Sequence, residues 1–254
     1  MRHILSPRNL PVLEQFAFRN VLLAFDFDGT LAPLVSVPDG AAIRPSTRRL
    51  LRALASLYPC IVVSGRSRAD VLRRLRGIGF QEVIGNHGIE PRDSSRDIAR
   101  EVESWIPVLN RKLRAIRGVV LESKTFTLSL HYRKARNRRQ ALKAILNAAR
   151  TLSGSRLIGG KQVVNVIPKG APDKGLAVER ERKHRHCDNV IYVGDDETDE
   201  SVFACGLPSR YLTIRVGVKK SSSASYFLRN QREIDRLLKF LVEIRSLGSS
   251  RLSA

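Results

Sequence analysis

The chain has 254 residues, of which 43% are apolar, so it can form one large domain or two smaller ones with a sizeable core. The 45 Lys and Arg residues outnumber the 24 Asp and Glu residues, and the formal net charge of +21 attracts anionic ligands. The sequence has no nucleic-acid-binding motif, no apolar run of 18 residues that would span a membrane, and no N-terminal signal-peptide pattern.

The first apolar run, residues 21–25, predicts a strand that ends at the motif DFDGT, residues 26–30. Short, wholly apolar runs are typical of strands buried on both faces of a parallel sheet. In such sheets, binding sites form beyond the carboxyl ends of the strands. A carboxylate can attack the phosphorus of a phosphate ester and form an aspartyl-phosphate, and Asp26, at the end of the strand, is placed for that role. Asp28, two residues further on, is placed to act as general acid and base.

A second predicted strand, residues 61–63, is followed by Ser64-Gly65-Arg66, where the Ser64 hydroxyl can hydrogen-bond a phosphoryl oxygen. Leucines at 50, 51, 54 and 57 predict a helix before this strand, and apolar residues at 71, 72 and 75 predict another after it. We expect Ser46 and Ser67 to cap these helices. Alternating strands and helices predict an α/β fold with a parallel sheet.

Residues 91–168 follow a different pattern and predict an inserted α+β cap domain, with the core formed by residues 1–90 and 169–254. Residues 119–133 alternate between apolar and polar, as in a half-exposed antiparallel strand. Lys124 lies on the same face as His131 and Arg133 only if a hairpin turn near Lys124 and Thr125 interrupts this strand. Residues 140–150 predict an amphipathic helix, and residues 162–167 predict a further strand.

The core pattern resumes at Lys174, which can neutralise the charge of a transferring phosphoryl group. The apolar run 190–193 predicts another strand, which ends at GDDETDE, residues 194–200. Carboxylates and retained waters are the ligands that Mg²⁺ prefers, so Mg²⁺ is the expected cofactor. The candidate ligands are Asp26, Asp28, Asp195 and Asp199. A last amphipathic helix is predicted over residues 231–245.

Four motifs have now been described along the chain: DFDGT, Ser64-Gly65-Arg66, Lys174 and GDDETDE. In this order, they resemble those of haloacid dehalogenase-like phosphohydrolases. Further stretches resemble one family of that superfamily, the trehalose-6-phosphate phosphatases: DFDGTLAP at 26–33, GNHG at 85–88, ESK at 122–124, HYR at 131–133 and GK at 160–161. The resemblance implies a Rossmann-like parallel-sheet core with an α+β cap, and Mg²⁺-dependent hydrolysis of trehalose 6-phosphate. It also implies a set of sugar-binding residues: Arg66, His87, Lys124, His131, Arg133, Lys161 and Asn165.

The sequence departs from the family pattern at Asn165 and Ile167, where the family usually has Glu and Arg. This departure leaves open another sugar phosphate, such as a sucrose, mannosyl-glycerate or glucosyl-glycerate phosphate. A basic nucleic-acid-binding or regulatory protein is a further alternative, but binding alone would not require the acids and lysine of the four motifs. Three widely spaced cysteines suggest reduced thiols and no zinc site. We expect a cytoplasmic monomer that acts on a small sugar phosphate.

Overall fold

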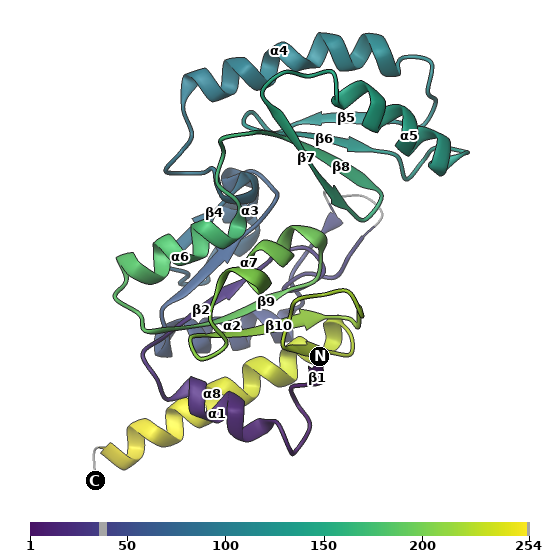
Figure 1. Ribbon diagram of the computed structural model, residues 1–254. Coiled ribbons are helices and arrows are strands. Elements are labelled where there is room, and N and C mark those ends of the chain that lie inside the picture. Colours follow the sequence, from purple (N-terminus) through teal and green to yellow (C-terminus); the bar gives the residue numbers. More distant parts are fainter. Residues whose placement is uncertain (36–39, 253–254) are drawn as a thin grey trace.

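The computed structural model of the protein describes residues 1–35 and 40–252, with side chains to residue 247. It contains a seven-stranded sheet in the order β1-β11-β10-β9-β2-β3-β4 and a four-stranded sheet in the order β5-β6-β8-β7. All strand pairs are parallel in the large sheet and antiparallel in the small one. The α/β prediction with a parallel sheet is therefore confirmed (Figure 1).

The large sheet consists of β1 (Arg2–His3), β2 (Val21–Phe25), β3 (Cys60–Val63), β4 (Glu82–Ile84), β9 (Asn189–Gly194), β10 (Tyr211–Val216) and β11 (Tyr226–Leu228). Every residue of β2, β3, β9 and β10 is buried. Burial on both faces requires helices on both faces. One face is covered by α1 (Leu10–Ala17), α2 (Pro45–Leu57), α3 (Arg68–Leu75) and α8 (Ile234–Leu252), and the other by α6 (Lys174–His184) and α7 (Glu200–Cys205).

The two predicted helix caps have different outcomes. Ser67 caps α3, because its side chain accepts a hydrogen bond from the Asp70 backbone N–H. The prediction for Ser46 is wrong: α2 begins at Pro45, whose fixed φ suits the first helical position, so Ser46 lies inside the helix. Its hydroxyl instead donates to Asp235 Oδ2 of α8 at 2.8 Å.

The small sheet is formed by β5 (Val120–Ser123), β6 (Leu128–His131), β7 (Ser155–Gly160) and β8 (Val163–Pro168). Helices α4 (Arg96–Leu113) and α5 (Arg138–Ala149) cover the face that points away from the large sheet (Figure 1). The single strand predicted over residues 119–133 is divided into β5 and β6 by a hairpin, and Thr125 has a φ of 70° in the turn between them. The predicted apolar face of α5 buries Ile145 but leaves Leu142 and Leu146 partly exposed.

Side chains alternate between the two faces of the small sheet. Leu128, Leu130, Val164 and Val166 pack with α4 and α5 in an apolar cluster made only of residues between 98 and 166. Since successive strand residues point to opposite faces, the residues between these leucines and valines lie on the face toward the large sheet. We call it the polar face, because Ser129 and Asn165 are directly paired in register there, although Val163 and Ile167 share it.

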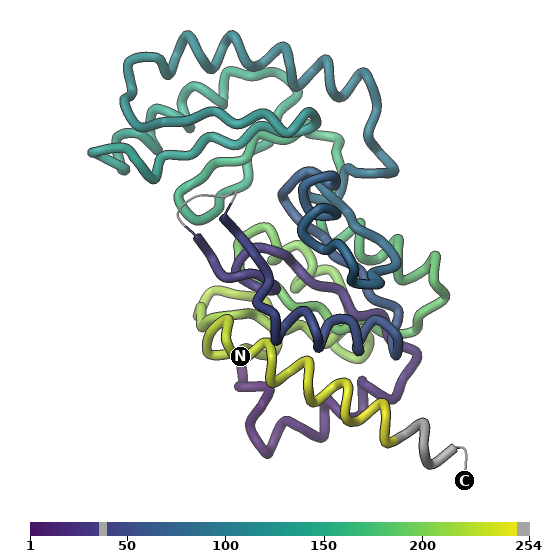
Figure 2. Tube along the Cα trace, turned by 180° about the vertical axis from the view of Figure 1, so that it is seen from behind, coloured from purple at the N-terminus to yellow at the C-terminus, as the bar shows by residue number. Residues whose placement is uncertain are grey.

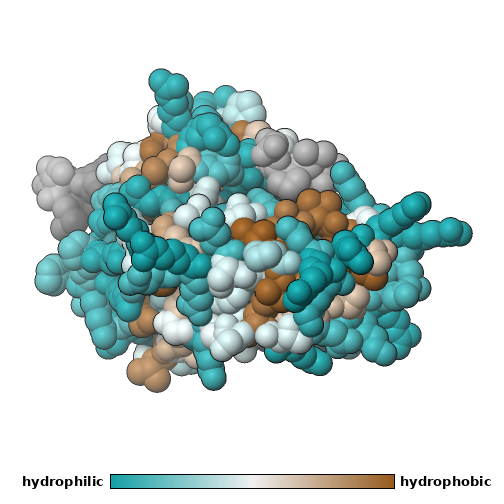
Figure 3. All heavy atoms as spheres, turned by 90° about the horizontal axis from the view of Figure 1, so that it is seen from above, coloured by the Kyte–Doolittle hydropathy of each residue, from teal (hydrophilic) through white to brown (hydrophobic). Residues whose placement is uncertain are grey.

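The chain enters and leaves the small-sheet part at neighbouring points, as the tube in Figure 2 shows. Gly88 lies against the backbone of Asp173, so closely that a β-carbon at position 88 would be 2.7 Å from the Asp173 carbonyl oxygen. Seen from above, the outer face over α4 and α5 has a band of apolar side chains among hydrophilic ones (Figure 3).

The described residues show no candidate membrane span, and the cysteines are unpaired. Within the part of the chain that the structure describes, no helix combines the length and apolar character needed to cross a bilayer. Cys60 and Cys187 carry buried free thiols, and Cys205 carries an exposed one.

Candidate active site

Four ionisable side chains meet at the carboxyl ends of β2 and β9. These strands are adjacent and pair Phe25 with Val193, so the residues that follow them, Asp26 and Asp195, lie side by side. Gly29 makes room for Asp195: its φ is 78°, and a β-carbon there would be 2.2 Å from Asp195 Oδ2. One carboxylate oxygen from each of Asp26, Asp195 and Asp199 lies within 4.8 Å of the others.

Lys174 is the fourth member of this cluster. It is the first residue of α6, whose N-cap Asp173 accepts a hydrogen bond from the Leu176 backbone N–H. Lys174 Nζ donates to Asp26 Oδ1 at 2.7 Å and to Asp199 Oδ1 at 2.8 Å, and its side chain is only 2% exposed. Burial opposes the charge, but the two carboxylates outweigh it and raise the pKa of Lys174, which stays protonated.

Asp199 is fully buried and holds the cluster together. Its Oδ1 accepts from Lys174 and from the Tyr192 hydroxyl at 2.7 Å, and its Oδ2 accepts from the backbone N–H groups of Asp195 and Asp196. Burial alone would raise the pKa of Asp199, but these partners lower it below its ordinary value. Four hydrogen bonds use the acceptor positions of both oxygens, so Asp199 orients its neighbours rather than offering a free electron pair.

Asp26 and Asp195 retain free acceptor capacity. Burial, opposed by Lys174, raises the pKa of Asp26 well above its ordinary value, and burial also raises the pKa of Asp195 to about 6. Asp195 Oδ2 accepts from Lys161 Nζ at 2.5 Å, whereas Oδ1 is buried without a hydrogen-bond partner. An unpartnered oxygen beside a second carboxylate suits a hard divalent cation, which would favour the ionised form of both acids. These residues therefore fit Mg²⁺.

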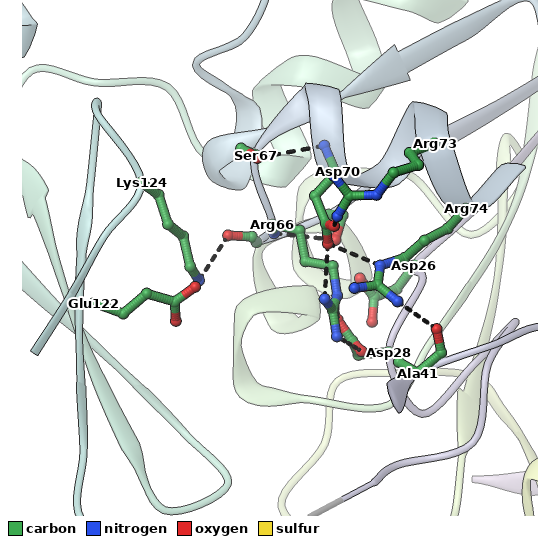
Figure 4. A network of polar contacts seen from close by, with 12 residues as sticks. Asp26, Asp28, Ala41, Arg66, Ser67, Asp70, Arg73, Arg74, Glu122 and Lys124 are labelled. Atoms are coloured by element: carbon green, nitrogen blue, oxygen red, sulfur yellow. Dashed lines mark hydrogen bonds and ion pairs between the residues drawn. The ribbon is translucent and has the colours of Figure 1, made fainter. Parts of the chain in front are cut away.

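The carboxylate of Asp28 lies outside this group of three acids. Arg66 holds it with two hydrogen bonds, Nε to Oδ2 at 2.6 Å and Nη2 to Oδ1 at 2.8 Å, while Nη1 donates to Asp70 Oδ2 at 2.7 Å (Figure 4). Arg66 also lies over the ring of Phe27, 5.6 Å from its centroid. The guanidinium of Arg66 thus fixes the position of the Asp28 carboxylate through two parallel hydrogen bonds. The sequence predicted separate roles for them, general acid and base for Asp28 and sugar binding for Arg66, but the two side chains form a pair.

The loops between the two sheets bring the other predicted residues to the site. Lys124, in the β5–β6 turn, donates to the Gly65 carbonyl at 3.0 Å, and Figure 4 shows it pointing at the loop that carries Arg66. Ser64, 1% exposed, follows β3 beside this contact. On the β7–β8 hairpin, Lys161 reaches Asp195. Asn165, on β8, is buried and accepts a hydrogen bond from the Ser129 hydroxyl at 2.8 Å.

His131 and Arg133 lie farther along the same polar face. His131 Nε2 is 2.7 Å from Glu122 Oε2, and Arg133 Nη1 donates to the Val35 carbonyl at 2.9 Å. Ile167, at the second departure from the family pattern, is fully buried and pairs with Arg156 across β7 and β8. Arg156 Nη2 donates to the carbonyls of Ala171 and Pro172, just before Lys174.

Sequence reasoning missed several polar residues that organise the site. Tyr192 was part of an apolar run, yet a buried tyrosine hydroxyl needs a partner, and that requirement was the available signal. Asn86 joins the two parts of the chain: its Oδ1 accepts from Thr127 at 2.7 Å and its Nδ2 donates to the Lys124 carbonyl at 3.1 Å. These contacts depend on how the insert is placed, which no local pattern encodes.

Comparison with known proteins agrees with this geometry. The sequence pattern of the family described as trehalose-phosphatase matches residues 24–232. A probable trehalose-phosphate phosphatase of Oryza sativa is 28% identical over 96% of this chain and 73% of its own length. A trehalose-phosphate phosphatase of Mycobacterium ulcerans is 35% identical over 70% of this chain, which spans only 50% of that relative.

Solved structures share the fold. The C-terminal domain of trehalose-6-phosphate phosphatase from C. albicans has a TM-score of 0.80 at 22% identity, covering 93% of this chain and 98% of that one. A sucrose-phosphatase from Synechocystis has a TM-score of 0.57 at 15% identity, covering 88% of this chain and 98% of that one. Fold and site together define a phosphoric monoester hydrolase of the haloacid dehalogenase-like class. Within that class, the chain belongs to the trehalose-phosphatase family.

Proposed function

We propose that the protein is a Mg²⁺-dependent phosphatase that hydrolyses trehalose 6-phosphate to trehalose and phosphate. The observation that carries this proposal is the cluster of Asp26, Asp195, Asp199 and Lys174 in a chain of the trehalose-phosphatase family. The choice of trehalose as the sugar rests on the names of the relatives, which are trehalose-phosphate phosphatases. Free thiols fit a reducing compartment, and we place the protein in the cytoplasm.

In the proposed mechanism, a carboxylate oxygen of Asp26 attacks phosphorus, and the bond from phosphorus to the sugar oxygen breaks. Asp28 donates a proton to that leaving oxygen and then removes a proton from the water that cleaves the aspartyl-phosphate, which releases phosphate and restores Asp26. Lys174 and the Ser64 hydroxyl stabilise the phosphoryl charge. Held by Asp26 and Asp195, Mg²⁺ would supply positive charge that offsets the repulsion between the acids and the substrate.

We further propose that residues 91–168 form a cap domain that selects the sugar. The support is the polar face of the small sheet, which is turned toward the acids, and the burial of the acids beneath it: Asp26 is 4% and Asp195 2% exposed. A substrate can reach these residues only if the cap moves away, and closure afterwards excludes water from the reaction.

Phosphate release tests the proposed function. With Mg²⁺, kcat/KM should be higher for trehalose 6-phosphate than for sucrose 6-phosphate and for mannosyl- or glucosyl-glycerate phosphates. Asp26→Asn should abolish turnover, because an amide of the same shape is not a nucleophile. The control Asp97→Asn alters an exposed acid of α4 and should leave the rate unchanged. Normal turnover by folded Asp26→Asn, or a clear preference for another sugar phosphate, would contradict the proposal.

A further inference from the structure

Positive charge is concentrated on the outer side of the small-sheet part. Residues 123–172 contain 11 Lys and Arg residues and no Asp or Glu, so about a fifth of the chain holds about half of its net charge of +21. Because α5 covers the face of the small sheet that points away from the large sheet, the proposed mechanism uses none of the cations on α5 or in the segment just before it (Figure 1). Six of these cations are exposed: Lys134, Arg136, Arg138, Arg139, Lys143 and Arg150.

The charges of α5 oppose the helix that carries them. Positive charge is unfavourable at a helix N-terminus, where the backbone dipole is itself positive, and like charges four residues apart repel each other. The first turn of α5 contains Arg138 and Arg139 and no acid, and Lys143 follows Arg139 by four residues. Helix α4, in the same part of the chain, has Asp97 in its first turn. An anionic partner lying on α5 would turn this repulsion into attraction.

A shallow groove of about 580 Å³ lies along the same side of α5. Leu142 and Leu146, one turn apart, line the groove and are only partly buried, although both pack on the apolar cluster of the small sheet. The exposed side chains of Arg139, Lys143 and Arg150 line it as well. Among the described residues, none of these three cations has an acidic partner. In Figure 3, the outer face shows the same combination of apolar and hydrophilic side chains.

The apolar and the charged side chains of the groove together select the class of partner. Nucleic acid binds through its phosphates and by stacking on aromatic rings, and no aromatic residue is among the described side chains that line the groove. A bilayer takes up apolar side chains that protrude, whereas Leu142 and Leu146 are partly buried between longer, exposed cations. An amphipathic helix with acidic flanks suits both kinds of side chain.

We propose that the groove on α5 is a docking surface for an acidic amphipathic helix of a partner protein. Apolar residues of that helix, spaced by one turn, contact Leu142 and Leu146, and its carboxylates pair with Arg139, Lys143 and Arg150. This surface is independent of the identity of the sugar phosphate and of Mg²⁺. Since the groove faces away from the acids, the partner can stay bound while the proposed hydrolysis proceeds.

A labelled peptide tests this proposal with the full-length protein. The probe is a synthetic helix with leucines one turn apart on one face and glutamates on both flanks, and the matched probe has the same residues in scrambled order. Fluorescence anisotropy should show tighter binding of the amphipathic probe, weakening as the salt concentration rises. Lys143→Glu should raise its Kd roughly 3- to 20-fold, because an attraction becomes a repulsion. Leu146→Asn should raise the Kd by a factor that salt does not reduce, because a hydrophobic contact is not screened.

The matched control is Arg49→Glu, which makes the same change of charge at an exposed position of α2, on the large-sheet part. It should leave the Kd within about twofold of the wild-type value. Circular dichroism shows whether each variant is folded. All three variants should release phosphate from para-nitrophenyl phosphate like the wild type. A wild type without phosphatase activity would contradict the proposed function and leave the peptide result valid.

Three outcomes would overturn the inference. Equal binding of the amphipathic and scrambled probes would show that the leucines are not used. An equal loss of binding with Arg49→Glu and Lys143→Glu would show a general attraction to a basic protein. Binding of duplex DNA or of phosphatidylserine vesicles that Lys143→Glu abolishes, without a preference for the amphipathic probe, would assign the surface to a nucleic acid or a membrane instead.

Discussion

The Asp195 side chain has an ion pair, an oxygen without a hydrogen-bond partner and a raised pKa. One oxygen is paired with Lys161, the other has no partner, and burial raises the pKa of the carboxyl group to about 6. Because this pKa lies above the ordinary value, the metal-free folded state is favoured while Asp195 is protonated, and this contribution is lost as the pH rises through about 6. A cation must bind the ionised form, so its affinity should change in the opposite direction.

We therefore expect the apparent Mg²⁺ affinity to fall by up to about tenfold per pH unit below pH 6, because a bound proton must first leave Asp195. Isothermal titration calorimetry between pH 5 and pH 8 measures this dependence. The increase in melting temperature on adding Mg²⁺ should also be larger at pH 7.5 than at pH 5. Asp195→Asn serves as the control and should bind Mg²⁺ weakly at every pH, because it lacks this carboxylate. A flat affinity profile for the wild type would contradict the assignment of Asp195 as a ligand.

At the scale of elements, the β5–β6 hairpin makes polar contacts with the loops that follow β3 and β4. Lys124 donates to the Gly65 carbonyl, and Thr127 and the Lys124 carbonyl both bind Asn86. Burial lowers the pKa of Lys124, which is a sign of a desolvated cation. A desolvated cation beside the proposed phosphate-binding loop would interact more strongly with an anion than an exposed one.

Lys124→Met should reduce kcat/KM for trehalose 6-phosphate roughly 10- to 150-fold, which corresponds to about 1.5–3 kcal/mol for a lost charged hydrogen bond. Hydrolysis of para-nitrophenyl phosphate should change much less, since that ester has no sugar for the proposed cap to bind. Lys134→Met, at an exposed position of the same insert, is the control and should behave like the wild type. Steady-state measurements of kcat/KM with the two substrates test this prediction. Equal losses on both substrates would argue against a role of Lys124 in sugar recognition.

The elements also show what the sequence could and could not predict. Asp26, Ser64 and Asp195 were found because buried parallel strands bring their carboxyl ends together, a rule that needs only local patterns. The pairing of Arg66 with Asp28, and the hydrogen bond from Tyr192 to Asp199, depend on side-chain packing between distant segments. The Ser46 cap failed because a proline one position earlier determined where α2 begins.

At the scale of the whole molecule, the apolar interior is divided. The cluster under α4 and α5 draws only on residues between 98 and 166, and the two clusters on the large sheet draw on none of them. The contacts described above between the two parts are polar, and a typical hydrogen bond contributes only about 0.5–1.5 kcal/mol of net stability. The small-sheet part should therefore unfold separately from the rest of the chain.

Ile145→Ala should test this division, because Ile145 is fully buried in the small-sheet cluster. The substitution should lower the stability of that part by about 2–5 kcal/mol, while the large-sheet part keeps its melting temperature. Leu238→Ala, fully buried in the large-sheet cluster, should have the reverse effect. Differential scanning calorimetry and hydrogen exchange follow the two parts, and a single transition that both substitutions shift equally would show one cooperative unit.

The close approach of Gly88 to Asp173 has an evolutionary consequence. An insertion whose two ends meet can be lengthened, shortened or exchanged without displacing the segments on either side. Asp26, Asp28 and Asp195 all lie outside it, whereas Lys124, Lys161 and Asn165 lie within it. The proposed hydrolytic chemistry and the proposed sugar selection could therefore change in separate mutational steps. The departures at Asn165 and Ile167 both fall in the exchangeable segment, where a change of substrate would leave the hydrolytic residues intact.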